Sequence, residues 1–251
     1  VDFGDALRLL ADRVGVTISQ RPEQKAEGKE RLYQVNQAAA QYFHNLLTSS
    51  PAGEKAREYV ARRGLSPKTI ADFQLGFSLN SWDALKQYLV GRGYNENELS
   101  TAGLVIETEA GKTYDRFRNL LMFPILDARG HTTGFGARVL DDSLPKYINS
   151  PQTPIFDKSS SLYGVNLAQT AIRQQDMAVI VEGYMDVITA HQYGFNNVIA
   201  SMGTALTEKQ VEMVKRLTKN ICLALDADAA GEMATLRGIE IAAHNLGQSI
   251  I

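Results

Sequence analysis

Four carboxylates follow two short apolar runs in the last third of the chain. Glu182 directly follows the run 178–181, and Asp186 comes four residues after it. Asp226 and Asp228 follow the run 221–225. If these runs are neighbouring parallel strands, their carboxyl ends meet at one edge of a sheet, where ligands bind in open α/β folds. Carboxylates gathered there repel one another unless a cation neutralises them, so the pattern predicts a divalent-cation site.

The type of ligand indicates which cation. Carboxylate oxygens alone favour Mg²⁺ or Mn²⁺, which bind through few protein ligands and also hold substrate phosphates. Taken singly, each residue has a plainer interpretation: Asp186 would lie in the first turn of a helix, where free N–H groups favour a carboxylate. A receiver or haloacid-dehalogenase domain would also place an Asp at a strand tip. Such a domain does not require EGxxD on one strand and DxD on another.

The elements that would position these carboxylates alternate regularly. From about residue 162, helical patterns separate strand-like runs at 178–183, 197–201 and 221–226. Thr207 and Gln210 have the spacing of a capping box, which predicts a helix beginning there. The order strand, helix, strand, helix, strand predicts a parallel sheet with helices on its faces.

The preceding part of the chain reads as mixed helical and antiparallel β structure. Helices are expected at 4–14, about 31–47 and 51–63 and after caps at Ser66 and Ser81, with a short turn or helix starting at 95–99 and a polar linker at 19–30. Strands are expected at 104–107, 113–117, 121–127 and 132–140. Pro124 lies inside the third of these strands and indicates a sheet edge or a bulge.

Composition restricts the class of protein. The 251 residues carry a net charge of −2, which gives no general support to nucleic-acid binding. No apolar run approaches the roughly 20 residues of a membrane span, and the N-terminus lacks the pattern of a signal peptide. Because Cys222 is the single cysteine, it can form neither an internal disulfide nor a CxxC zinc site. We therefore expect a cytoplasmic protein that does not bind a membrane.

Several motifs together resemble a known family. EGYMD at 182–186, ASMGT at 200–204 and DADAAG at 226–231 resemble a TOPRIM domain. YDRFRNLLMFPI at 114–125, GFGARVL at 134–140 and KYINSP at 146–151 extend the resemblance to DnaG-type bacterial primases over nearly the whole chain. In the last TOPRIM motif Ala227 stands where the family usually has Gly.

The resemblance implies a fold and a domain division. The expected fold is an α+β N-terminal subdomain followed by an α/β TOPRIM-like domain, a parallel sheet with flanking helices that is truncated at the C-terminus. The expected divisions are 1–28, a helix and linker following an absent zinc-binding domain; 29–161, the primase N-terminal subdomain; and 162–251, an incomplete TOPRIM domain. Zinc is expected only in the absent N-terminal domain.

The resemblance also implies an activity, which is Mg²⁺- or Mn²⁺-dependent, DNA-templated synthesis of short RNA primers during replication. A 3′-hydroxyl would attack the α-phosphate of a ribonucleoside triphosphate. The implied catalytic and metal residues are Glu182, Asp186, Asp226 and Asp228, with Glu182 either a ligand or a general base. The implied nucleotide and nucleic-acid contacts are Arg116, Arg118, Asn119, Arg138, Lys146, Asn149 and Lys158.

The implied partners are a single-stranded DNA template, ribonucleoside triphosphates and, through an absent C-terminal domain, a replicative helicase at the replisome. A fragment of this kind is expected to be weak or inactive alone. Two alternatives stay open: another TOPRIM enzyme, such as a nuclease or topoisomerase, or a non-enzymatic nucleotide-binding module. The basic residues could also form an ordinary solvated face, and Tyr184 and Met185 are interpreted as packing residues.

Overall fold

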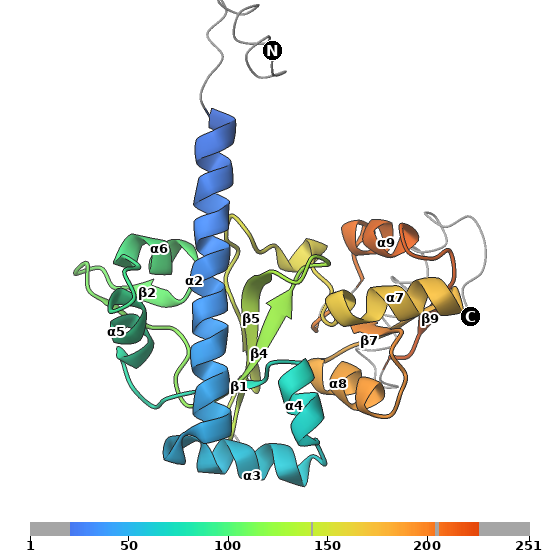
Figure 1. The fold of residues 1–251 in the computed structure, drawn as a ribbon, viewed down its shortest axis with the longest axis horizontal. Coiled ribbons are helices and arrows are strands. Elements are labelled where there is room, and N and C mark those ends of the chain that lie inside the picture. Colours follow the sequence, from blue (N-terminus) through green and yellow to red (C-terminus); the bar gives the residue numbers. More distant parts are fainter. Residues whose placement is uncertain (1–20, 142, 204–205, 226–251) are drawn as a thin grey trace, which may run out of the picture.

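The computed structural model describes residues 21–141, 143–203 and 206–225. The expected helix at 4–14, the predicted ligands Asp226 and Asp228 and the residues after them lie outside the described residues. Two regions lie side by side in Figure 1, here named the mixed region (residues 21–160) and the parallel region (residues 165–223). The predicted domain boundaries at 28/29 and 161/162 stay predictions.

A single long helix, α2 (Arg21–Ser49), runs along the mixed region (Figure 1). The linker predicted at 19–30 is therefore wrong for residues 21–30. Pro22 lies in the first turn, where its missing N–H removes no helical hydrogen bond. Gly28 costs the helix only about 1 kcal/mol relative to Ala. Burial of Val35, Ala39 and other residues further along the helix outweighs these local preferences.

The remaining helices of the mixed region are short. They are η1 (Pro51–Gly53), α3 (Glu54–Arg62), α4 (Pro67–Asp72), α5 (Ala84–Val90), α6 (Glu96–Thr101) and η2 (Lys158–Ser160). The cap predicted at Ser66 is confirmed by a bond from the Thr69 N–H (3.1 Å). The short turn or helix predicted from Asn95 is α6, and Asn95 caps it by accepting the Glu98 N–H (3.0 Å).

The cap predicted at Ser81 is wrong, because α5 begins after Asp83. The first amides of α5 are instead satisfied from a distant strand. The buried carboxylate of Asp115 accepts the N–H groups of Leu85 at 2.8 Å and Lys86 at 3.0 Å. A carboxylate that fills this role makes a hydroxyl cap unnecessary.

The mixed region is built on a four-stranded antiparallel sheet with strand order β1-β4-β5-β6. Its strands are β1 (Gly76–Ser78), β4 (Leu120–Leu126), β5 (Thr132–Val139) and β6 (Tyr147–Asn149). A separate hairpin joins β2 (Val105–Glu107) to β3 (Thr113–Asp115). The interpretation of Pro124 is confirmed: β1 pairs with β4 only as far as Met122, and the register shifts between Ile125 and Leu126.

The two faces of this sheet have different neighbours. Leu120 and Met122 of β4 belong to a core that includes buried residues of α2. Leu121, Phe123 and Ile125 point to the opposite face and belong to a core shared with the parallel region. This alternation is the period of two expected of a strand.

The parallel region contains a three-stranded parallel sheet with strand order β8-β7-β9. Its elements are α7 (Val165–Gln175), β7 (Ala178–Val181), α8 (Tyr184–Gln192), β8 (Val198–Ala200), α9 (Glu208–Lys215) and β9 (Ile221–Leu223). The capping box at Thr207 is confirmed. The predicted fold, an α+β part followed by an α/β part with a parallel sheet, is therefore confirmed for the described residues.

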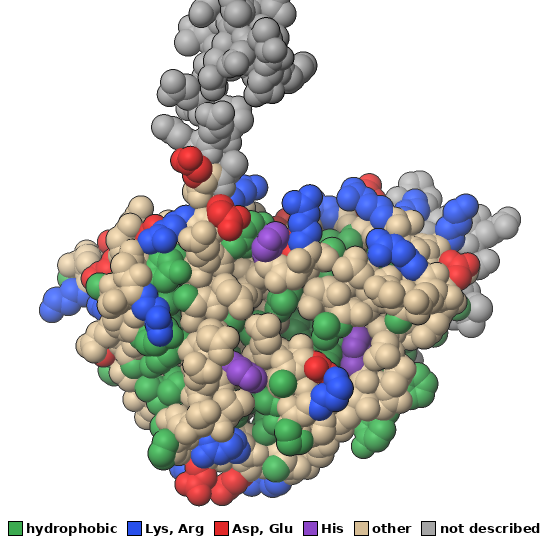
Figure 2. All heavy atoms as spheres, viewed as in Figure 1, with side chains coloured by type: hydrophobic (Ala, Val, Ile, Leu, Met, Phe, Trp, Pro, Cys, Tyr) green, Lys and Arg blue, Asp and Glu red, His purple; other side chains and the backbone are tan. Residues whose placement is uncertain are grey.

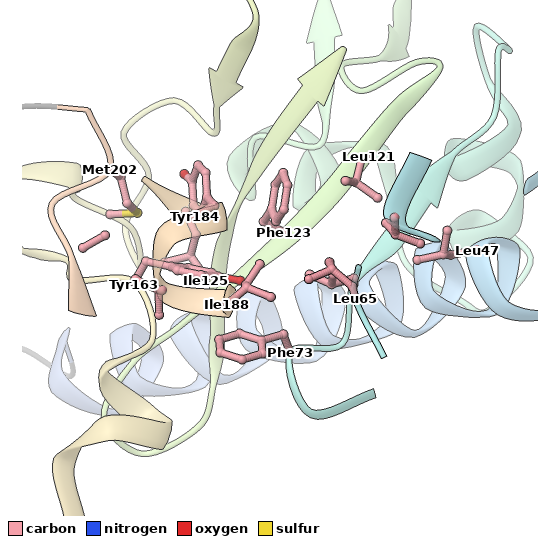
Figure 3. Close-up of a cluster of buried hydrophobic side chains, with 14 of the residues drawn as sticks. Leu47, Leu65, Phe73, Leu121, Phe123, Ile125, Tyr163, Tyr184, Ile188 and Met202 are labelled. Atoms are coloured by element: carbon pink, nitrogen blue, oxygen red, sulfur yellow. The ribbon is translucent and has the colours of Figure 1, made fainter. Parts of the chain in front are cut away.

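The two regions share one hydrophobic core. Figure 3 shows Phe123 and Ile125 of β4 beside Tyr184 and Ile188 of α8. The rings of Phe123 and Tyr184 are stacked at 4.9 Å with an interplanar angle of 9°. Helix α8 is thus buried against the sheet of the mixed region. Among the described residues, none of the helices has the length and apolar character needed to cross a membrane.

Candidate active site

The turn between β7 and α8 carries two of the predicted carboxylates. Glu182 follows the end of β7, and Asp186 lies in the first turn of α8. Asp186 Oδ2 accepts the Gly183 N–H at 3.0 Å, which fixes the carboxylate at the helix N-terminus. The Glu182 carbonyl accepts the Gly203 N–H at 3.0 Å and so ties the loop after β8 to this turn. Both residues lie at the carboxyl end of the parallel sheet, where the sequence predicted them.

The donor chemistry of this turn fits Mg²⁺ or Mn²⁺. Glu182 and Asp186 offer only oxygen atoms, the ligands that these ions prefer. Asp226 and Asp228 follow β9 in the sequence, and β9 pairs in parallel with β7 through Ile180 and Leu223. Within the described residues, no three His, Cys, Asp or Glu side chains form a metal-binding group. The set of four ligands stays a prediction.

Three of the predicted basic residues, Arg118, Arg138 and Lys146, lie at one end of the antiparallel sheet. Leu120 at the start of β4 pairs with Val139 near the end of β5, and Arg138 pairs with Tyr147 at the start of β6. The segments that hold Arg118, Asn119 and Lys146 adjoin the same end. Lys146 is exposed, and Asn119 has the left-handed φ of 57° that Asn tolerates better than most residues.

Arg138 is held between two aromatic rings. Its guanidinium carbon lies 5.0 Å from the ring centre of Tyr59 and 5.2 Å from that of Tyr147. Its Nη1 donates to the Tyr147 hydroxyl at 2.8 Å. The Nε atom is buried and has no hydrogen-bond partner among the described residues. Arg138 is therefore a cation held in place by two aromatic rings and by its bond to Tyr147.

Arg116 differs from its neighbour Arg118. Its Nε donates to the Gly103 carbonyl at 2.9 Å, and burial lowers the pKa of its guanidinium. This side chain is engaged within the mixed region, whereas Arg118 stacks on a partly exposed aromatic cluster. The structure thus separates two residues that the sequence motif treats alike.

Trp82 is a functional candidate that the sequence reasoning missed. The guanidinium of Arg118 lies 4.2 Å from the Trp82 ring centre, and Tyr114 meets the same ring edge-on at 5.2 Å. Trp82 is 65% exposed despite its size. It is the one tryptophan of the chain and stands in a polar stretch, which was the available signal. An exposed aromatic ring beside an arginine is suited to stacking on a nucleobase.

Asn149 links the sheet to the carboxylate turn. Its Oδ1 accepts a hydrogen bond from the hydroxyl of Tyr184, two residues before Asp186. Tyr184 is buried, which raises the pKa of its phenol, and its interpretation as a packing residue is confirmed. The ring lies directly on Gly136, where an added Cβ would come within 2.2 Å of it. The sheet is therefore shaped to receive this helix.

Lys158 lies at a pocket of about 370 Å³ beside the parallel region. Ser150, Gln152, Phe156, Asp157, Lys158, Ser159 and Thr207 line it. Hydrogen bonds from Ser159 and then Lys209 lower the pKa of Asp157 to about 2. Burial lowers the pKa of Lys158. A partly buried ammonium in an open pocket is suited to an anion such as phosphate.

Positive charge is not confined to the predicted residues. Figure 2 shows Lys and Arg side chains along the edge of the parallel region, over α7 and α9. Lys209 and Lys215 belong to α9 and Arg173 to α7. Charge alone therefore does not identify the site. Arg118, Arg138 and Lys146 are distinguished by their place at one end of the antiparallel sheet, whose strand β6 is bonded through Asn149 to Tyr184 at the start of α8.

Two family models match the chain. The model described as "DNA primase catalytic core, N-terminal domain" matches residues 42–169, and the model described as "Toprim-like" matches residues 179–251. The chain is also 46% identical over 243 residues to a DNA primase of Clostridium acetobutylicum. That match covers 95% of this chain and 40% of the relative. The chain thus spans well under half of the length of this relative.

Solved structures show the same similarity. A DnaG primase catalytic domain bound to single-stranded DNA superposes with a TM-score of 0.80 at 39% identity, covering 86% of this chain and 68% of that one. The RNA polymerase domain of the Mycobacterium tuberculosis primase DnaG superposes with a TM-score of 0.81 at 34% identity, covering 88% and 75%.

Proposed function

The chain belongs to the family of DnaG-type DNA primase catalytic cores, and on this premise we propose that it carries out DNA-templated synthesis of short RNA primers from ribonucleoside triphosphates. One observation supports this most. The helix that bears Asp186 is buried against the sheet whose end bears Arg138 and Asn149. A metal-binding turn and a phosphate-binding surface are therefore held together.

In this proposal the carboxylates bind Mg²⁺ or Mn²⁺. Glu182 and Asp186 are the described ligands, and Asp226 and Asp228 complete the set, with Glu182 either a ligand or a general base. A divalent ion bound there would neutralise phosphate charge and lower the pKa of an attacking hydroxyl.

The basic end of the sheet binds the nucleic acid and the nucleotide. Arg118, Arg138 and Lys146 offer charge-assisted hydrogen bonds to phosphates, and Trp82 offers a ring for base stacking. Lys158 holds a phosphate at its pocket, and Asn119 and Asn149 contribute amide contacts. Arg116 supports this surface from inside the mixed region. Because one solved relative is bound to single-stranded DNA, we assign the same ligand class to this surface.

The reaction forms a bond between a 3′-oxygen and the α-phosphorus and breaks the bond to the leaving pyrophosphate. The protein contributes mainly by positioning the reactants and by neutralising their charge. The proposed setting is the replisome in the cytoplasm, where a replicative helicase binds through a part of the protein outside this chain.

A chimera tests this function in a complete primase. The matching segment of the Clostridium acetobutylicum primase is replaced by this chain, and RNA products are measured on single-stranded DNA with Mg²⁺. We expect short RNA products from the chimera and weak or no synthesis by the chain alone. Strand cleavage in place of synthesis would instead support a TOPRIM nuclease. Binding of nucleotides with neither reaction would support a non-enzymatic module.

A further inference from the structure

Helix α8 is attached to the mixed region at both of its ends. At its first residue, Tyr184 stacks on Phe123 and bonds to Asn149. At its last residue, Gln192 reaches the segment around α4. The first attachment is mainly a buried aromatic contact, whereas the second combines the hydrogen bonds of Gln192 with an edge-on contact of the His191 ring on Phe73. Neither composition nor a sequence motif drew attention to Gln192.

Gln192 uses both ends of its amide. Its Oε1 accepts the Ser66 N–H at 2.8 Å and the Thr69 hydroxyl at 2.7 Å. Its Nε2 donates to the Gly64 carbonyl at 2.8 Å. All three bonds join residues more than 120 positions apart in sequence. A planar amide bonded in this way is fixed in position and in orientation.

The packing beside this amide is incomplete. A pocket of about 500 Å³ opens there, and its lining includes Thr69, Asp72, Leu167, His191 and Gln192 itself. The neighbouring His191 ring meets Phe73 edge-on at 5.3 Å. Close packing is therefore interrupted at this end of α8, and the hydrogen bonds of Gln192 carry a larger share of the attachment than they would in a filled core.

A helix that is attached at two separate points has a fixed direction. Helix α8 has nine residues and is about 13 Å long. Other contacts also join the two regions, because the His191 ring lies on Phe73 and Gln169 Nε2 of α7 donates to the Ala128 carbonyl at 2.8 Å. Without the three bonds of Gln192, the parallel region would have more freedom to rotate about the Tyr184 contact. Asp186 would then turn relative to Arg138, and the tip of β9, farther from the contact, would move more.

We propose that Gln192 is a positioning residue for the reaction, which fixes the angle between the carboxylate turn and the basic end of the sheet. Within the described part of the chain, its side-chain hydrogen bonds reach Ser66, Thr69 and Gly64, and none of these is a predicted metal-binding or phosphate-binding residue. Its role in the reaction rests on the function proposed above, whereas its role in fixing α8 does not. Misplacement of reacting groups by about 1 Å can cost about a hundredfold in rate. Loss of the Gln192 bonds, with the other contacts between the regions kept, is expected to cost about tenfold.

The first test measures how firmly the two regions of this chain are held relative to each other. Spin labels are placed at Lys55→Cys on α3 and Lys215→Cys on α9, both exposed, in a Cys222→Ser background. Electron–electron resonance then gives the distance distribution between the two regions. We expect Gln192→Ala to broaden this distribution. Gln87→Ala is the matched control, because Gln87 bonds only within its own helical turn, to Asp83 at 2.7 Å. An unchanged distribution for Gln192→Ala would overturn the proposal.

A variant of Thr69, the residue whose hydroxyl bonds to Gln192, keeps the test decisive if Gln192→Ala does not fold. Thr69→Val keeps the shape of the buried side chain and removes its hydroxyl donor to Gln192. We expect a smaller broadening in the same direction. If Gln192→Ala fails to fold, Thr69→Val decides: an unchanged distribution in this variant would overturn the proposal.

The second test separates positioning from binding. In the chimeric primase we expect Gln192→Ala to lower kcat about tenfold and to leave the affinities for Mn²⁺ and single-stranded DNA unchanged. A loss of Mn²⁺ affinity equal to the loss of rate would overturn the positioning role. If the unmodified chimera makes no primers, the proposed function fails, and the spin-label distances still decide whether Gln192 fixes α8.

Discussion

The two regions hold their charged groups by different means. In the mixed region arginines lie on aromatic rings: Arg118 on Trp82, and Arg138 between Tyr59 and Tyr147. In the parallel region Asp186 is held by a backbone N–H at a helix end. Stacking fixes a guanidinium while the N–H groups at its edge stay available for phosphate. A carboxylate at the end of a strand suits a small cation. The mixed region is thus suited to a polyanion and the parallel region to a metal.

The regions also differ in how far they depend on each other. The described strands of the parallel sheet have only three or four residues each, and its helix α8 is buried in the shared core. Short strands gain little stability from pairing alone. The geometry of the carboxylate turn therefore depends on the mixed region. Each region and the contact between them can therefore be tested by separate variants.

The largest expected effect concerns the parallel region alone. Asp186→Asn removes a proposed metal ligand, so primer synthesis by the chimera should fall about a hundredfold or more, because a bound divalent ion contributes several kcal/mol to such reactions. Affinity for single-stranded DNA should not change. Glu212→Gln, at an exposed position on α9, is the control. Full activity in Asp186→Asn would remove the carboxylate turn from the mechanism.

The next effect concerns the mixed region alone. Trp82→Ala should weaken binding of a short fluorescent oligodeoxynucleotide about 5- to 150-fold, since stacking contributes about 1–3 kcal/mol per base. Mn²⁺ affinity should be retained. Trp82→Phe should recover much of the binding, and Arg129→Ala, in an exposed turn at the other end of the sheet, should have little effect. Equal losses for Trp82→Ala and Arg129→Ala would indicate general charge and surface effects.

A third variant acts on the contact between the regions. Gly136→Ala places a Cβ within 2.2 Å of the Tyr184 ring. The free energy of unfolding in urea should fall by about 1–3 kcal/mol, the usual cost of overpacking. Gly28→Ala in α2 is the matched substitution, because nothing lies within 4 Å of its added Cβ. That variant should gain about 0.5–1 kcal/mol. A neutral Gly136→Ala would show that Tyr184 does not lie on this strand.

The smallest effect is a pH dependence at the edge of this contact. Burial lowers the pKa of His191, so between that value and about 6.5 the unfolded chain binds a proton that the folded chain does not. Stability should therefore fall as the pH drops below about 6.5, by at most about 1.4 kcal/mol per pH unit. Thermal unfolding at pH 7.5 and 5.5 measures this slope. If the His191→Gln variant shows the same dependence of stability on pH, groups other than His191 cause that dependence.

Local signals in the sequence predicted much of the fold. Ser66 with Pro67 and Thr207 with Gln210 mark helix starts through bonds three residues apart, so these positions could be found without a structure. The order of the runs around β7, β8 and β9 gave the parallel sheet. The place of Glu182 and Asp186 followed from that sheet. The extent of α2 did not, because packing along its length outweighs Pro22 and Gly28.

The contacts that organise the site are not local, which is why sequence reasoning missed them. Asp115 replaces the cap expected at Ser81 from 30 residues away. Gln192 bonds to Ser66 across 126 residues. The stacking of Arg118 on Trp82 likewise brings separate segments together. The strand period of two residues and the helix period of 3.6 residues carry no information about such contacts. Each contact can be seen only in the folded structure.

The central claim is that the carboxylates of one region and the basic surface of the other serve one reaction site. Paramagnetic relaxation tests it directly in this chain. Mn²⁺ is added to the protein with a bound, ¹⁹F-labelled oligodeoxynucleotide, and the relaxation of the fluorine is measured. We predict strong enhancement that disappears in the double variant Asp226→Ala with Asp228→Ala while the DNA stays bound. Enhancement that is absent when metal and DNA are both bound, or that persists in the double variant, would contradict the claim.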